Sequence, residues 1–346
     1  MPEDALSYRD AGVDIDAAGR ALRSISDAIR ATHNERTIGG IGSFGGLFDA
    51  SFPEMDRPTL VASIDGVGTK TKVAQMAGVF DHLGADIVNH CVNDILCQGA
   101  RPLFFLDYFA TSRLQQEVFA AVVKGAAEAC AAVGCVLIGG ETAEMPGVYV
   151  DEEIDIVGAI IGIVDYASKL PRAKVQAGDA LVGIASDGLH TNGFSLARRA
   201  LFEIGGYSVR DALPELGGSI AEALLKPHHC YFRSVYPLLA DFESIRAIAH
   251  ITGGGLYDNV PRALPSDCQA VIERRSWTPL PIFRLIQDAG NVPDQEMYRT
   301  FNMGIGMVLV CGKDVAEAVV QRLNASGEAA AVIGYIQSGP HDVQIA

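Results

Sequence analysis

An apolar run that ends in a glycine turn carrying polar side chains occurs four times along this 346-residue chain. The runs and their turns occupy residues 59–71, 136–147, 179–195 and 247–256. Apolar runs of this length predict buried strands, and the glycines leave backbone amides accessible where each strand ends. Because helical patterns separate the runs, the chain is expected to fold as an α/β protein whose turns carry the function.

The first turn, Ser63-Ile-Asp-Gly-Val-Gly-Thr-Lys-Thr71, suits a metal-bound phosphate. An aspartate can hold Mg²⁺, glycine amides can approach phosphate oxygens, and a lysine can neutralise their charge. The turn is not a Walker A loop, which needs Gly-Lys-Ser/Thr after four free positions. A tight glycine turn at a strand end is the alternative for this stretch alone. The candidate phosphate-binding residues are Asp65, Gly66, Gly68, Thr69 and Lys70.

The charge balance excludes some partners. The chain has 27 Lys plus Arg and 42 Asp plus Glu, a net charge of −15, which argues against nucleic acid or an anionic membrane as partner. Any phosphate site must then be built locally. The apolar fraction of 49% fits a globular protein, and the length suffices for two domains.

Cysteine usage and the N-terminal composition predict a cytoplasmic protein. The seven cysteines are scattered and form no CxxC pair, which is typical of reduced, mostly buried thiols. The N-terminus is acidic and lacks the basic and apolar regions of a signal peptide. The most apolar segment, 156–164, is half a membrane span or less.

The N-terminal part of the chain predicts a helix followed by a glycine-rich segment. The helix is expected from Asp14 to Thr32, with Asp14 or Asp16 as its cap. The segment 39–48 contains five glycines and also apolar side chains, which a solvated linker would not carry. A flap over an anionic ligand is therefore favoured over a flexible linker, with Gly42 and Ser43 as candidate substrate contacts.

Residues 84–97 predict a helix with one apolar side and one polar side. Asn93 lies on the polar side and Asp94 at its border, so Asp94 is either a satisfied polar group of the core or a ligand. A strand over 103–109 and a helix over 116–133 are expected next.

The stretch 136–147 predicts a short strand that ends at Gly139 and Gly140. Glu141 and Thr142 follow the glycines, and a carboxylate there suits a cation that bridges phosphates. The alternative is a glycine turn that leads into a solvated acidic loop. A strand over 154–164 is expected to close the sheet of the first domain.

Composition changes at a connector near residues 168–174, which places the domain boundary between residues 168 and 169. The domains are then 1–168 and 169–346. In the second domain, a strand over 179–185 leads into a turn with His190, Asn192 and Gly193. A histidine on a polar loop is better placed for proton transfer or ligand contact than one in a core.

The fourth turn, 250–255, reads His-Ile-Thr-Gly-Gly-Gly. The amides at the start of the helix expected after it can bind an anion, so the candidate substrate residues are Thr252, Gly253, Gly254 and Gly255. Further strands are expected at 269–273, 305–311 and 331–336, and helices at 281–288 and 314–324.

Taken in order, these motifs resemble the aminoimidazole ribonucleotide synthetase family, the phosphoribosylformylglycinamidine cyclo-ligases of purine biosynthesis. The resemblance runs almost end to end, and no single motif carries it. It rests on the stretches 8–16, 65–70, 92–95, 98–108, 139–147, 186–193, 250–255, 260–262 and 296–302.

The resemblance implies a fold, an assembly and a reaction. It implies two domains of α/β (α+β) type: an N-terminal mixed or antiparallel sheet with flanking helices that forms a homodimer and binds ATP, and a C-terminal sheet covered by helices. The implied reaction uses ATP and Mg²⁺ to close the ring of formylglycinamidine ribonucleotide, giving aminoimidazole ribonucleotide, ADP and phosphate.

The resemblance also implies roles for the candidate residues. Asp65, Asp94 and Glu141 would hold the metal and organise phosphates, and the strand before Asp65 is expected to be central. Lys70 would contact the ATP phosphates, and Asn93, Gly139, Gly140 and Thr142 would also bind the nucleotide. The expected catalytic residues are Asp94, His190 and Glu141. Many members carry a lysine on the first helix, which is absent here, so Arg23 or Arg30 would substitute or the contact would be missing.

Three alternatives share parts of this pattern. Selenophosphate synthetases would need a cysteine or selenocysteine in the glycine-rich segment 39–48, which has none. Thiamine-phosphate kinases share the Asp-Gly-Val-Gly-Thr-Lys type of motif. A non-catalytic nucleotide-binding protein of the same fold would be expected to lose the charged groups that this chain keeps.

Overall fold

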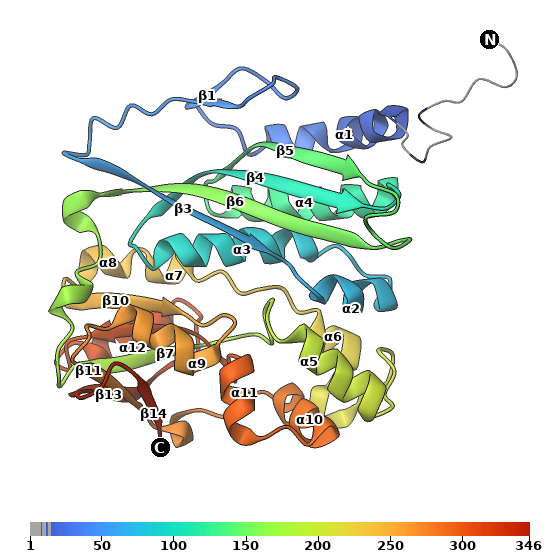
Figure 1. Ribbon diagram of the computed structural model, residues 1–346. Helices are drawn as coiled ribbons and strands as arrows, with labels where there is room; N and C mark the ends of the chain where they lie inside the picture. Colours follow the sequence, from blue (N-terminus) through green and yellow to red (C-terminus); the bar gives the residue numbers. More distant parts are fainter. Residues whose placement is uncertain (1–7, 9–11, 13–14) are drawn as a thin grey trace, which may run out of the picture.

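The computed structural model describes residues 8, 12 and 15–346. Its described residues form one large sheet in each half of the chain and two smaller two-stranded sheets. The expected helix cap at Asp14 lies outside the described residues. The N-terminal half stacks above the C-terminal half, with α3 (Leu83–Leu96) between the two sheets (Figure 1). Two related layers of strands and helices confirm the expected α/β class with two domains.

The N-terminal sheet is mixed and has the order β3-β6-β4-β5. Its strands are β3 (Pro58–Gly66), β6 (Ile154–Asp165), β4 (Arg101–Thr111) and β5 (Val136–Glu144). The pairs β3–β6 and β6–β4 are antiparallel, and β4–β5 is parallel. The strand that precedes the first glycine turn, expected to be central, is an edge strand because β3 pairs only with β6. The strand expected to close the sheet, β6, lies inside it.

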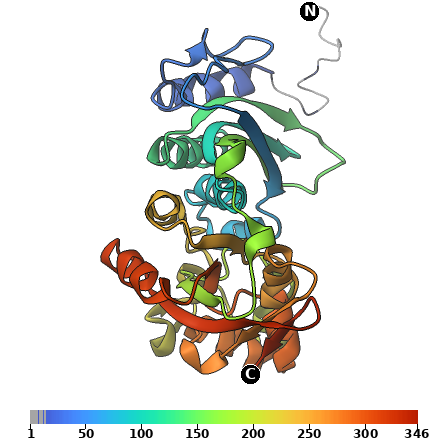
Figure 2. The ribbon, with the colours of Figure 1, turned by 90° about the vertical axis from the view of Figure 1, so that its left-hand side faces the viewer.

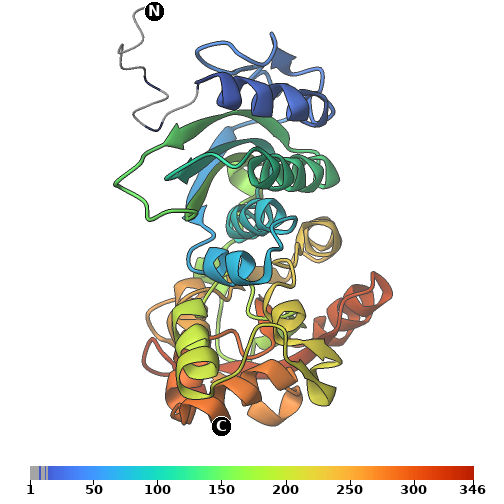
Figure 3. The same cartoon turned by 90° about the vertical axis from the view of Figure 1, so that its right-hand side faces the viewer.

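Helices cover one face of this sheet and leave the other open. In Figures 2 and 3, α1 (Ile15–Arg30), α4 (Gln116–Ala132) and α3 form a column on one side of the strands. Large apolar side chains of α3, α4, β4 and β6 fill the space between helices and sheet, among them Ile87, Val122, Phe105 and Ile160. The predicted helices at 14–32, 84–97 and 116–133 match these three to within a few residues. The helix α2 (Lys70–Ala77) follows β3 directly.

The C-terminal sheet has six strands in the order β10-β12-β7-β13-β11-β14. They are β10 (Ile245–His250), β12 (Ile305–Cys311), β7 (Ala180–Ala185), β13 (Ala330–Ser338), β11 (Cys268–Ile272) and β14 (Val343–Ile345). All pairs are antiparallel except β11–β14. β12 is buried along its whole length, as its apolar sequence predicts.

The longer helices of this half are α10 (Pro281–Gly290), α11 (Asp294–Thr300) and α12 (Ala316–Ala325). The helix expected after residue 193 is α5 (Phe194–Arg198), which continues as a π-helical turn over Arg199–Ile204. The shorter elements are β1 (Thr37–Ile38), β2 (Leu47–Phe48), β8 (Ala212–Leu213), β9 (Gly218–Ser219), α6 (Ile220–Leu224), α7 (Phe232–Val235), α8 (Leu238–Asp241) and α9 (Gly255–Asn259).

Among the described residues, none of the helices is both long and apolar enough to cross a bilayer.

Candidate active site at the domain interface

Two of the predicted carboxylates meet where the domains face each other. Asp65 stands at the end of β3 and Asp94 on α3. The Nε2 atom of His90, one turn before Asp94, lies 3.0 Å from Asp65 Oδ2 and 3.9 Å from Asp94 Oδ2. Ser63 Oγ donates to Asp94 Oδ2 at 2.9 Å. A strand end and a helix face thus hold the two acids around one imidazole.

Both carboxylates are stabilised as anions. Burial opposes ionisation of each, but the neighbouring histidines outweigh burial and lower the pKa of both Asp65 and Asp94. Burial likewise opposes the charge of His90, yet the hydrogen bond and charge of Asp65 and the charge of Asp94 raise its pKa. The site therefore holds two negative charges beside a histidine that favours its protonated form.

A chain of hydrogen bonds connects these acids through the C-terminal domain. His250 Nδ1 lies 2.8 Å from Asp94 Oδ1, and His250 Nε2 lies 2.9 Å from His228 Nε2. Thr191 Oγ1 then links His228 Nδ1 at 3.3 Å to His90 Nδ1 at 2.8 Å. Sequence reasoning did not select His90, His228 or Thr191. The available sequence signal is the spacing of His90 and Asp94, which lie four residues apart and are therefore neighbours on the helix surface.

His190 is buried and packs against this series of hydrogen-bonded residues at His228. Its ring stacks on His228 with the centroids 4.1 Å apart, and neither ring nitrogen has a hydrogen-bond partner among the described residues. Burial holds the pKa of His190 well below its usual range, so the ring is neutral. Its backbone has φ of 60°, and the turn places the ring inward rather than on an exposed loop.

Lys70 is buried and engaged inside the protein. Its Nζ donates to Asp86 Oδ1 at 2.8 Å and to the carbonyl of Lys226 at 2.6 Å, and its side chain has no exposed surface. This packing does not fit the expected contact with ATP phosphates. The ammonium instead joins α2, α3 and the C-terminal domain.

The rest of the first turn also faces the C-terminal domain. Thr69 Oγ1 lies 3.0 Å from Ser195 Oγ, at the start of α5. The Gly66 amide donates to Asp65 Oδ1 at 2.7 Å, and Gly68 has φ of 65°, a conformation that favours glycine. The hydrogen bond from the Gly66 amide stabilises the carboxylate of Asp65.

The polar side of α3 binds an extended segment of the C-terminal domain, residues 226–231, which we call the strap. Asn93 Nδ2 donates to the carbonyl of His229 at 2.7 Å, and Asn93 Oδ1 accepts from the Tyr231 amide at 3.0 Å. Asn89 Nδ2 donates to the carbonyl of His228 at 2.7 Å, and Asp86 Oδ1 accepts the His228 amide at 2.7 Å. Asn93, expected at the nucleotide, therefore holds the strap.

The second glycine pair lies at the opposite edge of the N-terminal sheet. β5 continues through Glu141 and Thr142 to residue 144, so the expected short strand and acidic loop are wrong. β6 and β4 separate β5 from β3, about 14 Å at three strand spacings. Within one chain, Glu141 therefore stands apart from Asp65 and accepts from the Thr142 amide at 2.9 Å.

The two glycines themselves have different environments in β5. A Cβ on Gly140 would lie 2.2 Å from Asp107 Oδ1 on the neighbouring strand, whereas one on Gly139 would make an ordinary contact with Leu106. Gly140 is thus explained by packing beside a buried carboxyl group, whose pKa burial raises to about 7.

The third and fourth turns do come together. A Cβ on Gly253 would lie 3.2 Å from Asn192 Oδ1, and the ring of Phe301 packs against Gly193. Asn259 Nδ2 donates to the carbonyls of Gly253 and Gly255 and also of Thr252. Gly254 and Gly255 both have positive φ. The candidate substrate residues Asn192, Gly193 and 252–255 thus form one surface.

The glycine-rich segment stands away from the body of the protein. It lies in the β1–β2 hairpin, where Gly42 and Ser43 are exposed. A Cβ on Gly42 would meet no atom within 4 Å, while one on Gly46 would clash with Ile138. The segment is anchored at its end and free at its tip.

A pocket of about 340 Å³ opens beside Asp94. It lies between the end of α3, the 3₁₀ turn Arg172–Lys174, β10 and the 3₁₀ turn Val260–Ala263. Its lining is Asp94, Cys97, Gln98, Arg172, Ile248, Ala249, His250, Asn259 and Arg262. The two arginines and Asn259 were not singled out from the sequence, because nothing in their local sequence distinguishes them.

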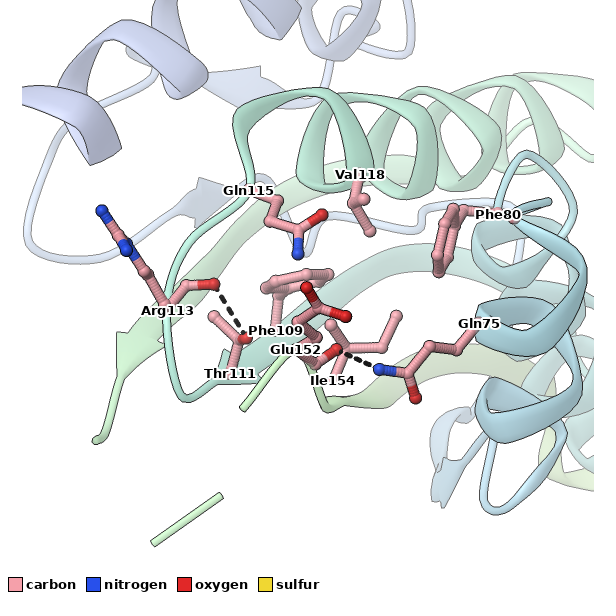
Figure 4. Close-up of a pocket in the computed structure, with 10 residues that line it drawn as sticks. Gln75, Phe80, Phe109, Thr111, Arg113, Gln115, Val118, Glu152 and Ile154 are labelled. Carbon is pink, nitrogen blue, oxygen red and sulfur yellow. Dashed lines mark hydrogen bonds between the residues drawn. The ribbon is translucent and has the colours of Figure 1, made fainter. Parts of the chain in front are cut away.

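A second pocket, of about 220 Å³, lies within the N-terminal domain (Figure 4). Phe80, Phe109, Val118 and Ile154 form its apolar wall, and Gln75 donates to the carbonyl of Glu152 at 2.7 Å. None of the residues predicted for the site lines it. The pocket beside Asp94 is therefore the one that the candidate site adjoins.

Comparison with family profiles matches both halves of the chain. The "AIR synthase related protein, N-terminal domain" family matches residues 49–164, and the "AIR synthase related protein, C-terminal domain" family matches residues 176–345.

Solved structures with the same fold cover almost the whole chain. Thiamine-monophosphate kinase from Stenotrophomonas maltophilia superposes with a TM-score of 0.67 at 18% identity, covering 94% of this chain and 95% of its own. The hydrogenase maturation protein HypE in complex with ATP gives 0.67 at 18% identity, covering 97% and 93%. At these identities the likeness concerns the fold alone.

Full-length relatives are much closer in sequence. The phosphoribosylformylglycinamidine cyclo-ligase of Geobacter metallireducens is 49% identical over 348 residues, covering 100% of both chains. That of Geotalea uraniireducens is 48% identical over 336 residues, covering 97% of this chain and 96% of its own. Both halves match the two family domains in order, and the identity extends over both, so this chain belongs to the phosphoribosylformylglycinamidine cyclo-ligase family.

Proposed function

We propose that the protein closes the imidazole ring of formylglycinamidine ribonucleotide in an ATP-dependent reaction that yields aminoimidazole ribonucleotide, ADP and phosphate. Membership of the family supports the reaction class. The observation that carries the proposal is the meeting of Asp65 and Asp94, two stabilised carboxylates from different elements, beside a pocket between the domains.

The reaction has two steps. The formamide oxygen of the substrate attacks the γ-phosphorus of ATP, so that an O–P bond forms, the bond to the β-phosphate oxygen breaks and ADP leaves. An amidine nitrogen then attacks the activated carbon, the C–O bond breaks and phosphate departs with the electron pair, while the nitrogen loses a proton. Phosphorylation converts a poor leaving group into a good one, and the protein supplies position and charge.

Asp65 and Asp94 fit a divalent cation such as Mg²⁺. Their oxygens are hard ligands, both groups are stabilised as anions, and Mg²⁺ prefers carboxylates together with phosphate oxygens. When bound, the cation would neutralise charge on the transferring phosphoryl group. His90 and Ser63 orient the two carboxylates, so the acids keep their positions without the cation.

The expected roles of three other residues change. Lys70 is a buried ammonium group whose contacts join the two domains, and the ring of His190 stacks on the ring of His228. Glu141 and the glycines beside it reach the same nucleotide only if a second chain brings its β5 edge close to Asp65. Asn192 and the turn 252–255 remain the proposed substrate surface.

We propose a homodimer assembled through the open face of the N-terminal sheet. Leu60 and Ile64 project from β3 with 65% and 69% of their surface exposed, and none of the helices in the described part of the chain covers this side (Figure 3). Exposed apolar side chains that share one face of a strand are typical of an interaction surface. The domain 1–168 then carries ATP and the dimer contact, and 169–346 carries the substrate. The seven free thiols fit a cytoplasmic enzyme.

A coupled assay of ADP release tests the function. With formylglycinamidine ribonucleotide and ATP, we expect substrate-dependent ADP release and the appearance of aminoimidazole ribonucleotide. Thiamine phosphate and selenide serve as comparison substrates for the two related activities. If ADP is released only with one of these, or with none of the three, the proposed function is wrong.

A further inference from the structure

The pocket beside Asp94 is lined by residues of both charges. Asp94 and His250 line it together with Arg172 and Arg262. Asp65 is not among its lining residues. The two arginines belong to the 3₁₀ turns Arg172–Lys174 and Val260–Ala263, whereas the paired carboxylates belong to β3 and α3.

Neither arginine is neutralised. Among the described residues, no carboxylate lies within ion-pair distance of Arg172 or Arg262, although the chain carries a net charge of −15. Arg172 Nη1 donates to the carbonyl of Arg262 at 2.9 Å, and Arg262 Nη1 donates to Asn259 Oδ1 at 3.2 Å. Each guanidinium has five N–H donors, so both keep free donors on an exposed edge.

Asn259 connects Arg262 to the triple-glycine turn, residues 252–255. Its Oδ1 accepts from Arg262 and from Thr252 Oγ1, while its Nδ2 holds the turn 252–255 through three carbonyls. Because Asn259 is buried, the position of Arg262 relative to the turn is fixed. Two cations that line one pocket, one of them linked to an ordered turn, are suited to a phosphate monoester, which arginine binds through paired N–H groups.

We propose that Arg262 and Arg172 bind the 5′-phosphate of the nucleotide substrate and so direct its reacting end toward Asp94. This inference rests on the proposed function, and it moves the phosphate contact from the glycine amides alone to the two arginines. ATP is a second source of phosphate. Asp65 does not line this pocket, and Arg262 is linked through Asn259 to the turn 252–255 proposed for the substrate; both observations favour the substrate, and the experiment distinguishes the two sources.

The test measures kcat/KM for the nucleotide and for its 5′-dephosphorylated riboside in the wild type, Arg262→Ala, Arg262→Lys and Arg172→Ala. We expect each alanine variant to reduce the nucleotide-to-riboside ratio by about tenfold or more, and Arg262→Lys to reduce it less. The KM for ATP should stay within about twofold. Arg284→Ala, an exposed arginine on α10, is the matched control and should leave every value unchanged.

The ratio separates phosphate binding from a structural role. A variant that only loosens the pocket lowers kcat/KM for nucleotide and riboside equally, and an unchanged ratio in both alanine variants overturns the proposal. A raised KM for ATP with an unchanged ratio overturns it as well, because the arginines would then serve the other phosphate.

A binding measurement separates this inference from the proposed function. Calorimetry with ribose 5-phosphate does not depend on turnover, and we expect affinity that falls about tenfold or more in Arg262→Ala. Such arginine-dependent binding supports the phosphate site even if no ADP is released with the proposed substrate. Normal ADP release with equal ribose 5-phosphate affinity in wild type and variants overturns the phosphate site alone.

Discussion

Two aspartates held by histidines give the site its charge. Asp94 is contacted on one oxygen by His250 and on the other by Ser63, and His90 lies beside Asp65. Since the neighbouring histidines lower the pKa of each acid, both stay ionised at neutral pH. The geometry thus fits the proposed divalent cation, whose positive charge the two carboxylates would balance.

Replacing Asp94 tests this directly. Asp94→Asn keeps the shape and removes the charge, so we expect kcat to fall about 100-fold or more while the far-UV circular dichroism stays unchanged. Asp288→Asn, an exposed aspartate on α10, is the control and should behave as wild type. Turnover of Asp94→Asn near the wild-type rate would remove Asp94 from the machinery.

A different histidine makes stability depend on pH. His229 lies 2.8 Å from Asp187 and 3.0 Å from Glu328. Burial lowers its pKa, but these hydrogen bonds and charges outweigh burial and raise the pKa to about 9. Because the folded pKa exceeds the unfolded value of about 6.5, the stabilisation is complete below pH 6.5 and is lost as pH rises through about 9.

Urea unfolding at several pH values checks this prediction. The difference in unfolding free energy between wild type and His229→Gln should be largest below pH 6.5 and should shrink toward pH 10. His341→Gln, a histidine at the C-terminal end of the chain, serves as the control. A difference that stays constant from pH 6 to 10 would show that the charge of His229 contributes nothing.

At the residue scale, the sequence singled out Asp65 and Asp94, which the structure brings together around His90, but it did not predict the burial of Lys70. An acid at a strand end and an acid on a helix border are local features. The partners of Lys70 are Asp86, on another helix, and a carbonyl 156 residues away, and neither leaves a mark in the motif. A lysine beside glycines looks the same whether it faces a phosphate or a buried carboxylate.

Among the elements, α3 does the most to join the domains. Its apolar side packs under the sheet, and the side chains of Asp86, Asn89 and Asn93 bind the backbone of the strap. These residues are three and four positions apart, which places them on one side of the helix. The helix therefore recognises the strap through its peptide groups.

Removing Asn93 should weaken this contact more than removing Asn89. Asn93→Ala leaves a half-buried carbonyl and a buried amide without these partners, and we expect a loss of about 2 kcal/mol in unfolding free energy. Asn89→Ala removes one hydrogen bond and should cost about half as much. Glu128→Ala on α4 is the control. Equal stability of Asn93→Ala and wild type would contradict the assignment.

Hydrophobic periodicity predicted the main helices and strands, because α3, α4, β6 and β12 each bury a face that their sequence shows. It failed at β5, where the strand continues past two glycines because β4 pairs with it up to residue 144. The strap was not predicted. Its peptide groups, not its own side chains, bind the side chains of α3, and such backbone contacts leave no periodic pattern in the sequence of the strap.

At the scale of the whole molecule, the open face of the N-terminal sheet leaves the apolar side chains of Leu60 and Ile64 exposed in a single chain. We expect Ile64→Lys to convert a dimer into monomers, as measured by sedimentation equilibrium, because a charge would be buried in the contact. Activity should fall with it if Glu141 of a second chain contributes. Ile204→Lys, equally apolar and exposed in the C-terminal domain, should remain dimeric. A wild type that sediments as a monomer would exclude the dimer.

The strap and the buried Lys70–Asp86 pair also bear on how ligands enter and leave. The domains are joined by the connector between β6 and β7 and, in addition, by buried polar contacts along α3. Swinging the domains apart would expose these groups together, so a hinge opening is costly. We therefore expect ligands to enter and leave while the two domains turn as one body.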